Sequence, residues 1–339
     1  MGSIYKTALI AGAAGFIGSH LTERLLKDGY KVIALDNYND YYDPLIKKRN
    51  ILDVKRTMEH YEIEAERMQI IEADIRDLDR LDEIFRGKKP DIVVHLAAMA
   101  GVRPSINNPL EYYEVNIKGT VNMLEMCRKQ GIGKFVFASS SSVYGNNEKI
   151  PFSEADNVDK PISPYAATKR AGELMCHTWH FLYGIDIACL RFFTVYGPRQ
   201  RPDLAIHKFT RMILNDEEIP FYGDGNSERD YTYIDDIIDG IVKAMNWVSE
   251  GAGKYDIFNL GESNAISLSR MVEVLEKALS RKARLRRLPM QPGDVQTTYA
   301  DISKSAEVLG YQPSMDFEVG IGIFVDWYLK WLKSELSEL

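Results

Sequence analysis

The chain has 339 residues, of which 45% are hydrophobic, and its formal net charge is −7. This length suits two lobes that share one cleft, or one large α/β domain. The negative charge disfavours a nucleic-acid partner, and no segment approaches the about 20 consecutive apolar residues that a membrane-spanning helix needs. The chain also starts without a basic and apolar leader, so we expect a cytoplasmic protein that acts away from membranes.

The three cysteines, Cys127, Cys176 and Cys189, are widely spaced and form no CxxC pair. We interpret them as buried thiols in a reducing compartment. His177 and His180 lie three residues apart on an expected helix, but no further ligand is close to them in the sequence. We therefore expect no metal site.

Short apolar segments alternate with helical patterns through the first half of the chain. Their Val, Ile, Leu and Phe residues occupy both faces, which is typical of buried parallel strands. We expect strands at Thr7–Ala11, Lys31–Asp36, Met68–Asp74, Asp91–Ala97, Lys134–Ser139 and Ile185–Phe193. The polar segment Tyr38–Met68 is a long excursion between strands, with room for a helix. The alternation predicts an α/β fold with a Rossmann-type doubly wound parallel sheet.

Beyond Thr194 the elements become shorter and are separated by Gly and Pro. The pattern predicts helices at Leu204–Leu214, Asp236–Trp247, Ser267–Leu279 and Phe317–Trp331. Residues 1–193 should form the Rossmann domain, and residues 194–339 mainly a smaller α/β lobe, with some segments returning to the first domain. We interpret the basic run Arg281–Arg287 as a solvated strand edge, and Asp235 and Asp236 as the N-cap of the following helix.

A glycine-rich turn follows the first strand and precedes a helix. Gly12, Gly15 and Gly18 would allow a tight turn, close approach of a pyrophosphate and close packing of helix on strand. A bare turn is the alternative for a glycine triplet taken alone. Asp36 ends the second strand, where a carboxylate accepts hydrogen bonds from both ribose hydroxyls and repels a 2′-phosphate. The motif therefore predicts NAD as the cofactor rather than NADP.

The GxxGxxG spacing resembles the extended short-chain dehydrogenase/reductase family, and further matches extend over nearly the whole chain. The resemblance implies additional cofactor contacts along the dinucleotide. They fall on Phe16, Ile17, Asn37, Asp74, Ile75, Leu96, Ala97, Ala98, Asn116, Ser139 and Phe193.

Tyr165 and Lys169 are spaced i, i+4, which places them on one face of an expected helix. A free tyrosine has a pKa near ~10, so proton transfer at neutral pH needs a nearby cation such as Lys169 or a nicotinamide ring. In the family, the catalytic hydroxyl stands three residues before the Val of a VYG motif, which implies Ser140 here. N-capping or loop solvation is the alternative for each serine of this run.

The resemblance implies oxidation at C4 of a nucleotide sugar, with Tyr165 taking the hydroxyl proton. In the dehydratases of the family, two acidic residues follow the catalytic hydroxyl; Ser141 and Ser142 stand there in this chain. Elimination is therefore disfavoured, and decarboxylation somewhat so. Return of the hydride to the other face of C4 remains, which is epimerisation.

The segment Arg191–Asp203, RFFTVYGPRQRPD, resembles the signature of UDP-glucuronate 4-epimerases, which convert UDP-glucuronic acid to UDP-galacturonic acid. Carried over, Thr194 and Arg201 would hold the C6 carboxylate, assisted by Ser141 and Ser142. An arginine offers a planar fork matched to a carboxylate. A surface ion pair is the alternative for Arg201.

Further substrate contacts are implied by the same resemblance. Arg103, in the AGVR run, matches the glucuronate subgroup. Arg229 and Asp294 match groups at the nucleotide phosphates, although Gln291 replaces an arginine that galactose epimerases carry before PGD. The family also implies a homodimer, through a four-helix bundle of the segments 116–130 and 165–182 from each copy.

Three other functions stay open on the sequence. One is a 4-epimerase of UDP-glucose and UDP-galactose, or of their N-acetyl forms, with Arg201 only structural. The second is a UDP-glucuronate decarboxylase. The third is a non-catalytic protein that binds NAD or a sugar nucleotide, which the intact Ser140, Tyr165 and Lys169 argue against.

Overall fold

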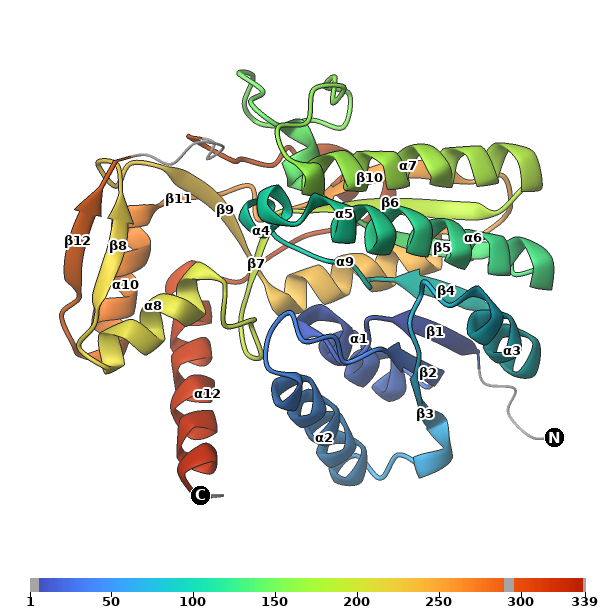
Figure 1. Ribbon diagram of the computed structural model, residues 1–339, viewed down its shortest axis with the longest axis horizontal. Helices are drawn as coiled ribbons and strands as arrows, with labels where there is room; N and C mark the ends of the chain where they lie inside the picture. The colour runs from blue at the N-terminus through green and yellow to red at the C-terminus, as the bar shows by residue number, and fades with distance from the viewer. Residues whose placement is uncertain (1–5, 290–295, 338–339) are drawn as a thin grey trace.

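A seven-stranded parallel sheet forms the centre of the protein (Figure 1). The computed structural model describes residues 6–289 and 296–337. The strand order is β10-β6-β5-β4-β1-β2-β3, and each neighbouring pair is parallel. The strands are β1 (Thr7–Ala11), β2 (Lys31–Asp36), β3 (Met68–Glu72), β4 (Ile92–His95), β5 (Lys134–Ser140), β6 (Asp186–Phe192) and β10 (Tyr255–Leu260). The prediction of a Rossmann-type doubly wound sheet is confirmed.

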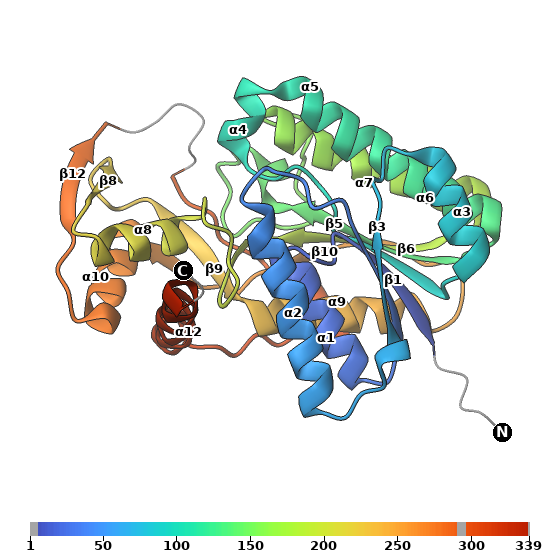
Figure 2. The ribbon, with the colours of Figure 1, turned by 60° about the horizontal axis from the view of Figure 1, so that its bottom comes forward.

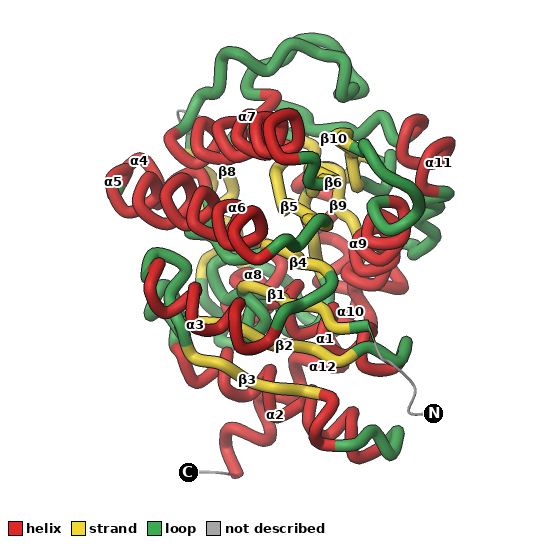
Figure 3. The backbone as a smooth tube through the Cα atoms, turned by 90° about the vertical axis from the view of Figure 1, so that its right-hand side faces the viewer, coloured by secondary structure: helices red, strands yellow, loops and turns green. Residues whose placement is uncertain are grey.

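Helices cover both faces of this sheet, as the view along the strands shows (Figure 3). One face carries α3 (Leu78–Lys88), α6 (Gly119–Gln130) and α7 (Pro164–Tyr183). The other carries α1 (Phe16–Lys27), α2 (Pro44–His60) and α9 (Ile234–Trp247). Side chains of β1 alternate between the two layers, since Leu9 belongs to the buried cluster that includes α3 and α6, and Ile10 to the cluster that includes α1 and α2. This alternation explains why the strands are apolar on both faces.

Shorter elements connect the layers. They are the 3-10 turn η1 (Ala65–Arg67), α4 (Val102–Asn107), α5 (Pro109–Tyr112), the π-helical turn η2 (Tyr113–Lys118), the 3-10 turn η3 (Ser141–Tyr144) and α11 (Ser303–Leu309). The predicted excursion Tyr38–Met68 does contain a helix, α2, which packs beside α1 (Figure 2).

The second lobe lies beyond the carboxyl ends of the central strands (Figure 1). It contains β7 (Thr194–Tyr196), β9 (Glu228–Tyr233) and β11 (Ala265–Ser267) as one small sheet, and β8 (Glu218–Tyr222) paired with β12 (Arg284–Leu288). Its helices are α8 (Ala205–Leu214), α10 (Leu268–Leu279) and α12 (Phe317–Ser337). The basic run is an exposed strand, β12, as predicted.

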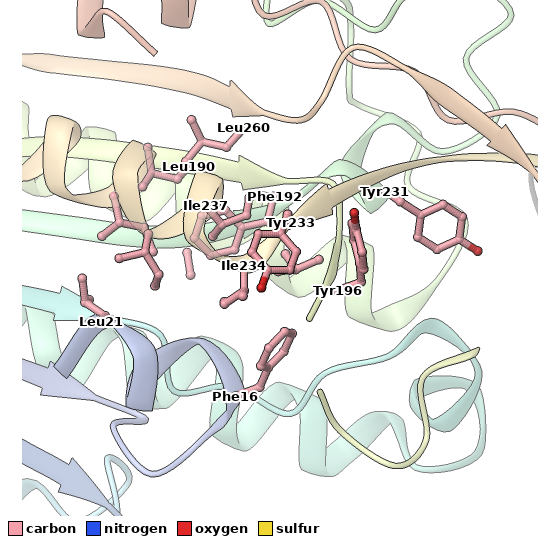
Figure 4. Close-up of a cluster of buried hydrophobic side chains, with 14 of the residues drawn as sticks. Phe16, Leu21, Leu190, Phe192, Tyr196, Tyr231, Tyr233, Ile234, Ile237 and Leu260 are labelled. Atoms are coloured by element: carbon pink, nitrogen blue, oxygen red, sulfur yellow. The ribbon is translucent and has the colours of Figure 1, made fainter. Parts of the chain in front are cut away.

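The two lobes share one hydrophobic core on the α1 and α9 side of the sheet. Figure 4 shows Phe16 of α1 and Ile234 of α9 between the central sheet and the tyrosines of the small sheet, among them Tyr196. Because α9 starts in the small lobe and then packs against β5 and β6, it ties the two lobes together. The division at residue 193 therefore remains a prediction, and α9 and β10 are the segments that return to the first domain.

Two details differ from the sequence-based expectation. The strand β10 was not predicted, because Asp256 and Asn259 interrupt its apolar pattern. Asn259 is nevertheless fully buried, since it accepts a hydrogen bond from Tyr144 and donates to the backbone oxygens of Phe152 and Asp301. Tertiary partners thus allow a buried polar residue inside β10, the strand at one edge of the large sheet.

Asp235 and Asp236 do not form the N-cap of α9, which is Tyr233. They lie in the first turn of the helix, where a negative charge interacts favourably with the helix dipole. Asp236 also accepts backbone hydrogen bonds from Ser314 and Met315.

The three cysteines are free and buried. Within the described residues, no group of His, Cys, Asp and Glu side chains is arranged to hold a metal ion. None of the described helices is long and apolar enough to cross a membrane.

Candidate active site

A cavity of about 360 Å³ lies at the carboxyl ends of the central strands, where the second lobe covers them. Strand ends are the usual ligand site in a doubly wound sheet. The cavity wall combines the glycine turn, the ends of β2, β4, β5 and β6, the start of α7 and the segment from Phe193 to Leu204. Most of the predicted site residues line it: Gly12, Gly15, Phe16, Ile17, Gly18, Asp36, Asn37, Ile75, Leu96, Ala97, Ala98, Ser139, Ser140, Ser141, Ser142, Tyr165, Lys169, Phe193, Thr194 and Arg201.

The glycine turn leaves no space for side chains. Gly12 has a φ of +87°, and a Cβ placed on it would lie 2.8 Å from the backbone nitrogen of Ala97. A Cβ on Gly18 would lie 2.0 Å from the carbonyl oxygen of Gly12. The backbone can therefore approach a ligand closely at the N-terminus of α1, where the helix dipole favours a phosphate. These residues fit the pyrophosphate of a dinucleotide.

Asp36 ends β2 at the other side of this turn and is buried. Its carboxylate accepts the backbone N–H of Ala14 at 3.0 Å and that of Tyr38 at 2.9 Å. The Nζ of Lys47, on α2, lies 3.7 Å from the same carboxylate and donates to the carbonyl oxygen of Asn39 at 2.9 Å. Lys47 was not predicted as a site residue, because in the sequence it is one of several lysines in the polar segment Tyr38–Met68.

Two of the expected cofactor residues stand behind the wall rather than in it. Asp74 accepts hydrogen bonds from Arg76 and Asn37, and these bonds outweigh burial and lower the pKa of Asp74 to about 2. Asn116 is buried and bonds both backbone groups of Met99. Asp74 therefore supports Asn37, and Asn116 supports Met99, and both supported residues line the cavity.

The catalytic candidates come from two elements. Ser140 ends β5, and its hydroxyl donates to Ser142 Oγ and accepts the N–H of Ser142, each at 3.2 Å. The same hydroxyl acts on Tyr165, near the start of α7, and lowers the pKa of the phenol. The Nζ of Lys169 lies 5.9 Å from the centre of the Tyr165 ring and donates to the carbonyl oxygen of Ala138 at 2.7 Å. Ser163 caps α7 by accepting the N–H of Ala166, which fixes where the helix begins.

Burial disfavours the charged forms of both Tyr165 and Lys169. Burial raises the pKa of Tyr165 above its usual value, while the hydrogen bond from Ser140 and the positive charge of Arg201 act in the opposite direction. Burial lowers the pKa of Lys169 to about 8. Lys169 is therefore largely protonated at neutral pH, and a further positive charge at the cavity would lower the pKa of Tyr165.

Ser139 differs from its three neighbours. Its hydroxyl donates to the fully buried carboxylate of Glu173 on α7, at 2.6 Å. Arg191 of β6 donates two hydrogen bonds of 2.9 Å to the same carboxylate. The Ser139 hydroxyl is thus engaged in the packing of β5 against α7, although the residue borders the cavity.

Arg201 lies in the same cavity as Tyr165, with its guanidinium 5.6 Å from the ring centre of Tyr41. It donates to both carboxylate oxygens of Asp203, at 2.9 and 2.8 Å. Arg201 thus lines the cavity and also forms an ion pair with Asp203, and its binding of a substrate carboxylate stays a prediction. Among the described residues that line the cavity, Asp36 is the one acidic side chain, and it belongs to the β2 side.

Tyr41 and Tyr42 also line the cavity, and the sequence analysis missed them. The sequence NYNDYY, residues 37–42, has no hydrophobic periodicity, so we interpreted it as part of a polar connection between strands. Three hydroxyl-bearing rings within six residues, directly after the acidic end of β2, were the available signal.

Two other predicted substrate residues, Arg103 and Arg229, lie outside the cavity lining. Arg103 of α4 stacks on Tyr222 of β8, with 5.2 Å between the guanidinium carbon and the ring centre, so it bridges the two lobes. Arg229 lies on β9 and donates to the carbonyl oxygen of Glu228. Asp294 falls outside the described residues.

The fold and the cavity place a dinucleotide-type glycine turn and the residues Ser140, Tyr165 and Lys169 around one cavity, as in NAD-dependent enzymes with a doubly wound sheet. The model of the NAD dependent epimerase/dehydratase family matches residues 8–261, and the chain belongs to this family.

Three comparisons indicate where in the family the chain stands. It is 41% identical to the UDP-glucuronate 4-epimerase of Thermodesulfobacterium geofontis, over 94% of this chain and 95% of that protein. The structure of the Bacillus cereus UDP-glucuronic acid 4-epimerase, in complex with UDP-glucuronic acid and NAD, is similar with a TM-score of 0.86. Its identity is 36%, over 96% of this chain and 99% of that one. The Thermotoga maritima UDP-glucose 4-epimerase with UDP-glucose is 31% identical, over 96% and 99% of the two chains, with a TM-score of 0.84.

Replacing Asp36 by Asn tests the cofactor side of the cavity. The change removes the charge that would repel a 2′-phosphate, and it leaves the ammonium of Lys47 beside the ribose site. Because relief of one like-charge contact is worth on the order of 1.4 kcal/mol in a partly buried site, we expect NADP affinity relative to NAD to rise about ten-fold.

Isothermal titration of the cofactor-free protein with each dinucleotide measures this ratio. Asp91→Asn is the control, since Asp91 receives the N–H of Thr7 at the opposite, amino end of the sheet. An unchanged ratio in Asp36→Asn would show that Asp36 does not select the cofactor.

Proposed function

We propose that this protein is a UDP-glucuronate 4-epimerase, which uses NAD to interconvert UDP-glucuronic acid and UDP-galacturonic acid. The observation that carries the proposal is a guanidinium in the same cavity as the catalytic tyrosine. The charge of Arg201 acts on Tyr165, so a sugar whose C4 hydroxyl meets Tyr165 brings its C6 substituent toward Arg201. A carboxylate at C6 fits that position best.

Proton transfer falls to the residues of β5 and α7. Tyr165 takes the proton of the C4 hydroxyl, and Ser140, which lines the same cavity and lowers the pKa of Tyr165, holds the C4 oxygen and relays the proton. Lys169 keeps a positive charge close to the phenol. The glycine turn and Asp36 would hold NAD, which would supply reversible hydride transfer at C4 of the sugar.

The sugar end of the cavity must keep the carboxylate while the ring turns over. A C4-oxidised glucuronic acid is a β-keto acid, and it loses carbon dioxide when its carboxylate is desolvated and aligned with the ketone. Hydrogen bonds from Arg201, Thr194, Ser141 and Ser142 would keep the carboxylate solvated and out of that alignment. These four residues line the cavity together.

The rival reactions need groups that this cavity wall offers less well. Elimination needs an acid next to the catalytic hydroxyl, where Ser141 and Ser142 stand. A neutral-sugar epimerase would leave Arg201 without a substrate partner. The similarity to the Thermotoga maritima UDP-glucose 4-epimerase makes neutral sugars the second candidate substrate.

We further propose that the protein is a homodimer in which α6 and α7 of two copies form a four-helix bundle. Large apolar side chains are exposed on this side of the molecule. Leu174 and Phe181 of α7 are 54% and 79% exposed, and Leu110 and Tyr113 are exposed ahead of α6. An exposed apolar face of this kind is typical of an interface between copies.

We also propose a cytoplasmic location for the protein. The three free cysteines fit this location, because thiols stay reduced in the cytoplasm.

Arg201→Ala tests the substrate assignment. The change removes a charge-assisted hydrogen bond worth about 1.5–3 kcal/mol, so affinity for UDP-glucuronate should fall ten-fold or more. Affinity for UDP-glucose should hardly change, and a UDP-pentose by-product should appear because the carboxylate rotates more freely. Calorimetry with both nucleotides, and mass spectrometry of the products, measure these effects.

Arg211→Ala, on the exposed side of α8, serves as the control. Equal weakening for both sugars would assign Arg201 to the phosphates or to the lobe structure. If Arg201→Ala binds both nucleotides as tightly as the unchanged protein does, the assignment of UDP-glucuronate as the substrate loses its physical support.

Phe181→Glu tests the dimer. A carboxylate in the centre of a buried apolar interface is costly, so we expect the molar mass to fall to that of one chain at micromolar concentration. Light scattering after size-exclusion chromatography measures it. Leu52→Glu on α2, where the leucine is also exposed, should leave the mass unchanged. A Phe181→Glu protein that remains a dimer would rule out this face.

A further inference from the structure

The aspartate that holds Arg201 stands two residues after it on the same segment. Asp203 occupies two groups of the guanidinium, Nε at 2.9 Å and Nη2 at 2.8 Å. The side chains of Arg201 and Asp203 are 19% and 37% exposed, so the pair sits at the cavity rim and is partly shielded from water. Burial alone would raise the pKa of Asp203, but the hydrogen bonds and charge of Arg201 hold it below its usual value. Asp203 is therefore a carboxylate at neutral pH.

This geometry leaves a second edge of the guanidinium available. An arginine fork has five N–H groups, and one carboxylate takes two of them. Asp203 takes the edge of Nε and Nη2, and within the described part of the chain no other oxygen bonds the Nη1 side. A substrate carboxylate can therefore bind Arg201 at the edge of Nη1 and Nη2 while Asp203 stays in place.

The backbone around the pair is held firmly. Arg199 adopts a φ of +63°, and its guanidinium bonds Glu23 of α1 at 2.7 Å. Gln200 is buried, and its side chain donates to the carbonyl oxygen of Val195 and accepts the N–H of His207. These contacts fix the segment on both sides of Arg201. Adjustment to a moving substrate must therefore come from side chains rather than from the loop.

Turnover requires the sugar carboxylate to leave Arg201 and to return. The 4-keto sugar has to present its opposite face to the cofactor, and its carboxylate moves with the ring. A partly buried guanidinium that loses its only counter-ion is strongly disfavoured. With Asp203 bound, Arg201 stays paired throughout, and the negative charge of Asp203 also weakens the hold on the substrate carboxylate.

We propose that Asp203 is a positioning residue that lowers affinity for the substrate carboxylate so that the 4-keto intermediate can turn over. This inference rests on the proposed function, because it requires that Arg201 binds the C6 carboxylate. It assigns Asp203 to the rotation step rather than to the oxidation of C4, which belongs to Tyr165 and Ser140.

Asp203→Ala tests the inference on the enzyme with its bound NAD. Without Asp203 the substrate carboxylate becomes the counter-ion of Arg201, so UDP-glucuronate should bind at least three-fold more tightly. Rotation should slow, so kcat should fall about ten-fold while KM falls as well. Reduced cofactor should accumulate during turnover and be visible as absorbance at 340 nm. Affinity for UDP-glucose should stay the same.

Asp203→Asn, which keeps the shape of the side chain, should show the same signs with smaller amplitudes and secures the test if the alanine variant is unstable. Asp28→Ala removes a comparable pair, with Arg24 at 2.8 Å on the surface of α1, and should change none of these quantities.

The outcomes separate the two proposals. If the unchanged enzyme does not epimerise UDP-glucuronate, the proposed function itself fails. If it does, but Asp203→Ala raises KM, leaves kcat unchanged or shows no rise at 340 nm, then only the role of Asp203 is overturned. A merely structural aspartate would weaken binding and would not make reduced cofactor accumulate.

Discussion

The buried carboxylate of Glu173 holds the catalytic elements together. It lies on α7 one turn beyond Lys169, is fully buried, and receives Arg191 from β6 and Ser139 from β5. These bonds join the helix that carries Tyr165 to the strand that ends in Ser140. Removing one partner of a buried ion pair of this kind typically costs about 3–5 kcal/mol, because the other charge is left uncompensated. The placement of Ser140 relative to Tyr165 thus depends on the Glu173–Arg191 ion pair, and neither of those two residues lines the cavity.

The cavity holds its two ends by different means. At the dinucleotide end, backbone atoms form the wall, and the backbone packs so closely around Gly12 and Gly18 that no side chain fits there. At the sugar end, long side chains form the wall, and Arg201 and Tyr41 extend into the cavity from two separate loops. Rigid backbone suits a cofactor that must stay in place, and adaptable side chains suit a sugar that must turn over. This contrast is the physical basis of the proposed epimerisation.

Much of this site could be predicted from the sequence because its signals are local. The glycine turn, Asp36 at the end of β2, and the i, i+4 pair of Tyr165 and Lys169 each lie within one element or at its end. Their roles remain proposals, but their convergence on one cavity follows from the parallel sheet, whose strand ends meet at one edge.

The parts that escaped prediction depend on contacts between distant segments. Lys47 reads as a surface helix residue until the fold brings it to Asp36. The β10 strand reads as interrupted until Tyr144, over a hundred residues away, satisfies Asn259. Asp203 is adjacent to Arg201 in sequence, yet its pairing geometry appears only when the side chains are placed. The hydrophobic periodicity of a sequence does not show which distant side chains will come into contact.

The proposed epimerisation requires that a hydride leaves C4 and returns to C4 of the same sugar. UDP-glucuronic acid carrying deuterium at C4, incubated with the enzyme in ordinary water, tests it directly. Mass spectrometry and proton NMR of the separated products report where the label goes. The expected product is UDP-galacturonic acid with the deuterium retained at C4. Loss of the label to water, or an unconverted substrate, would contradict it.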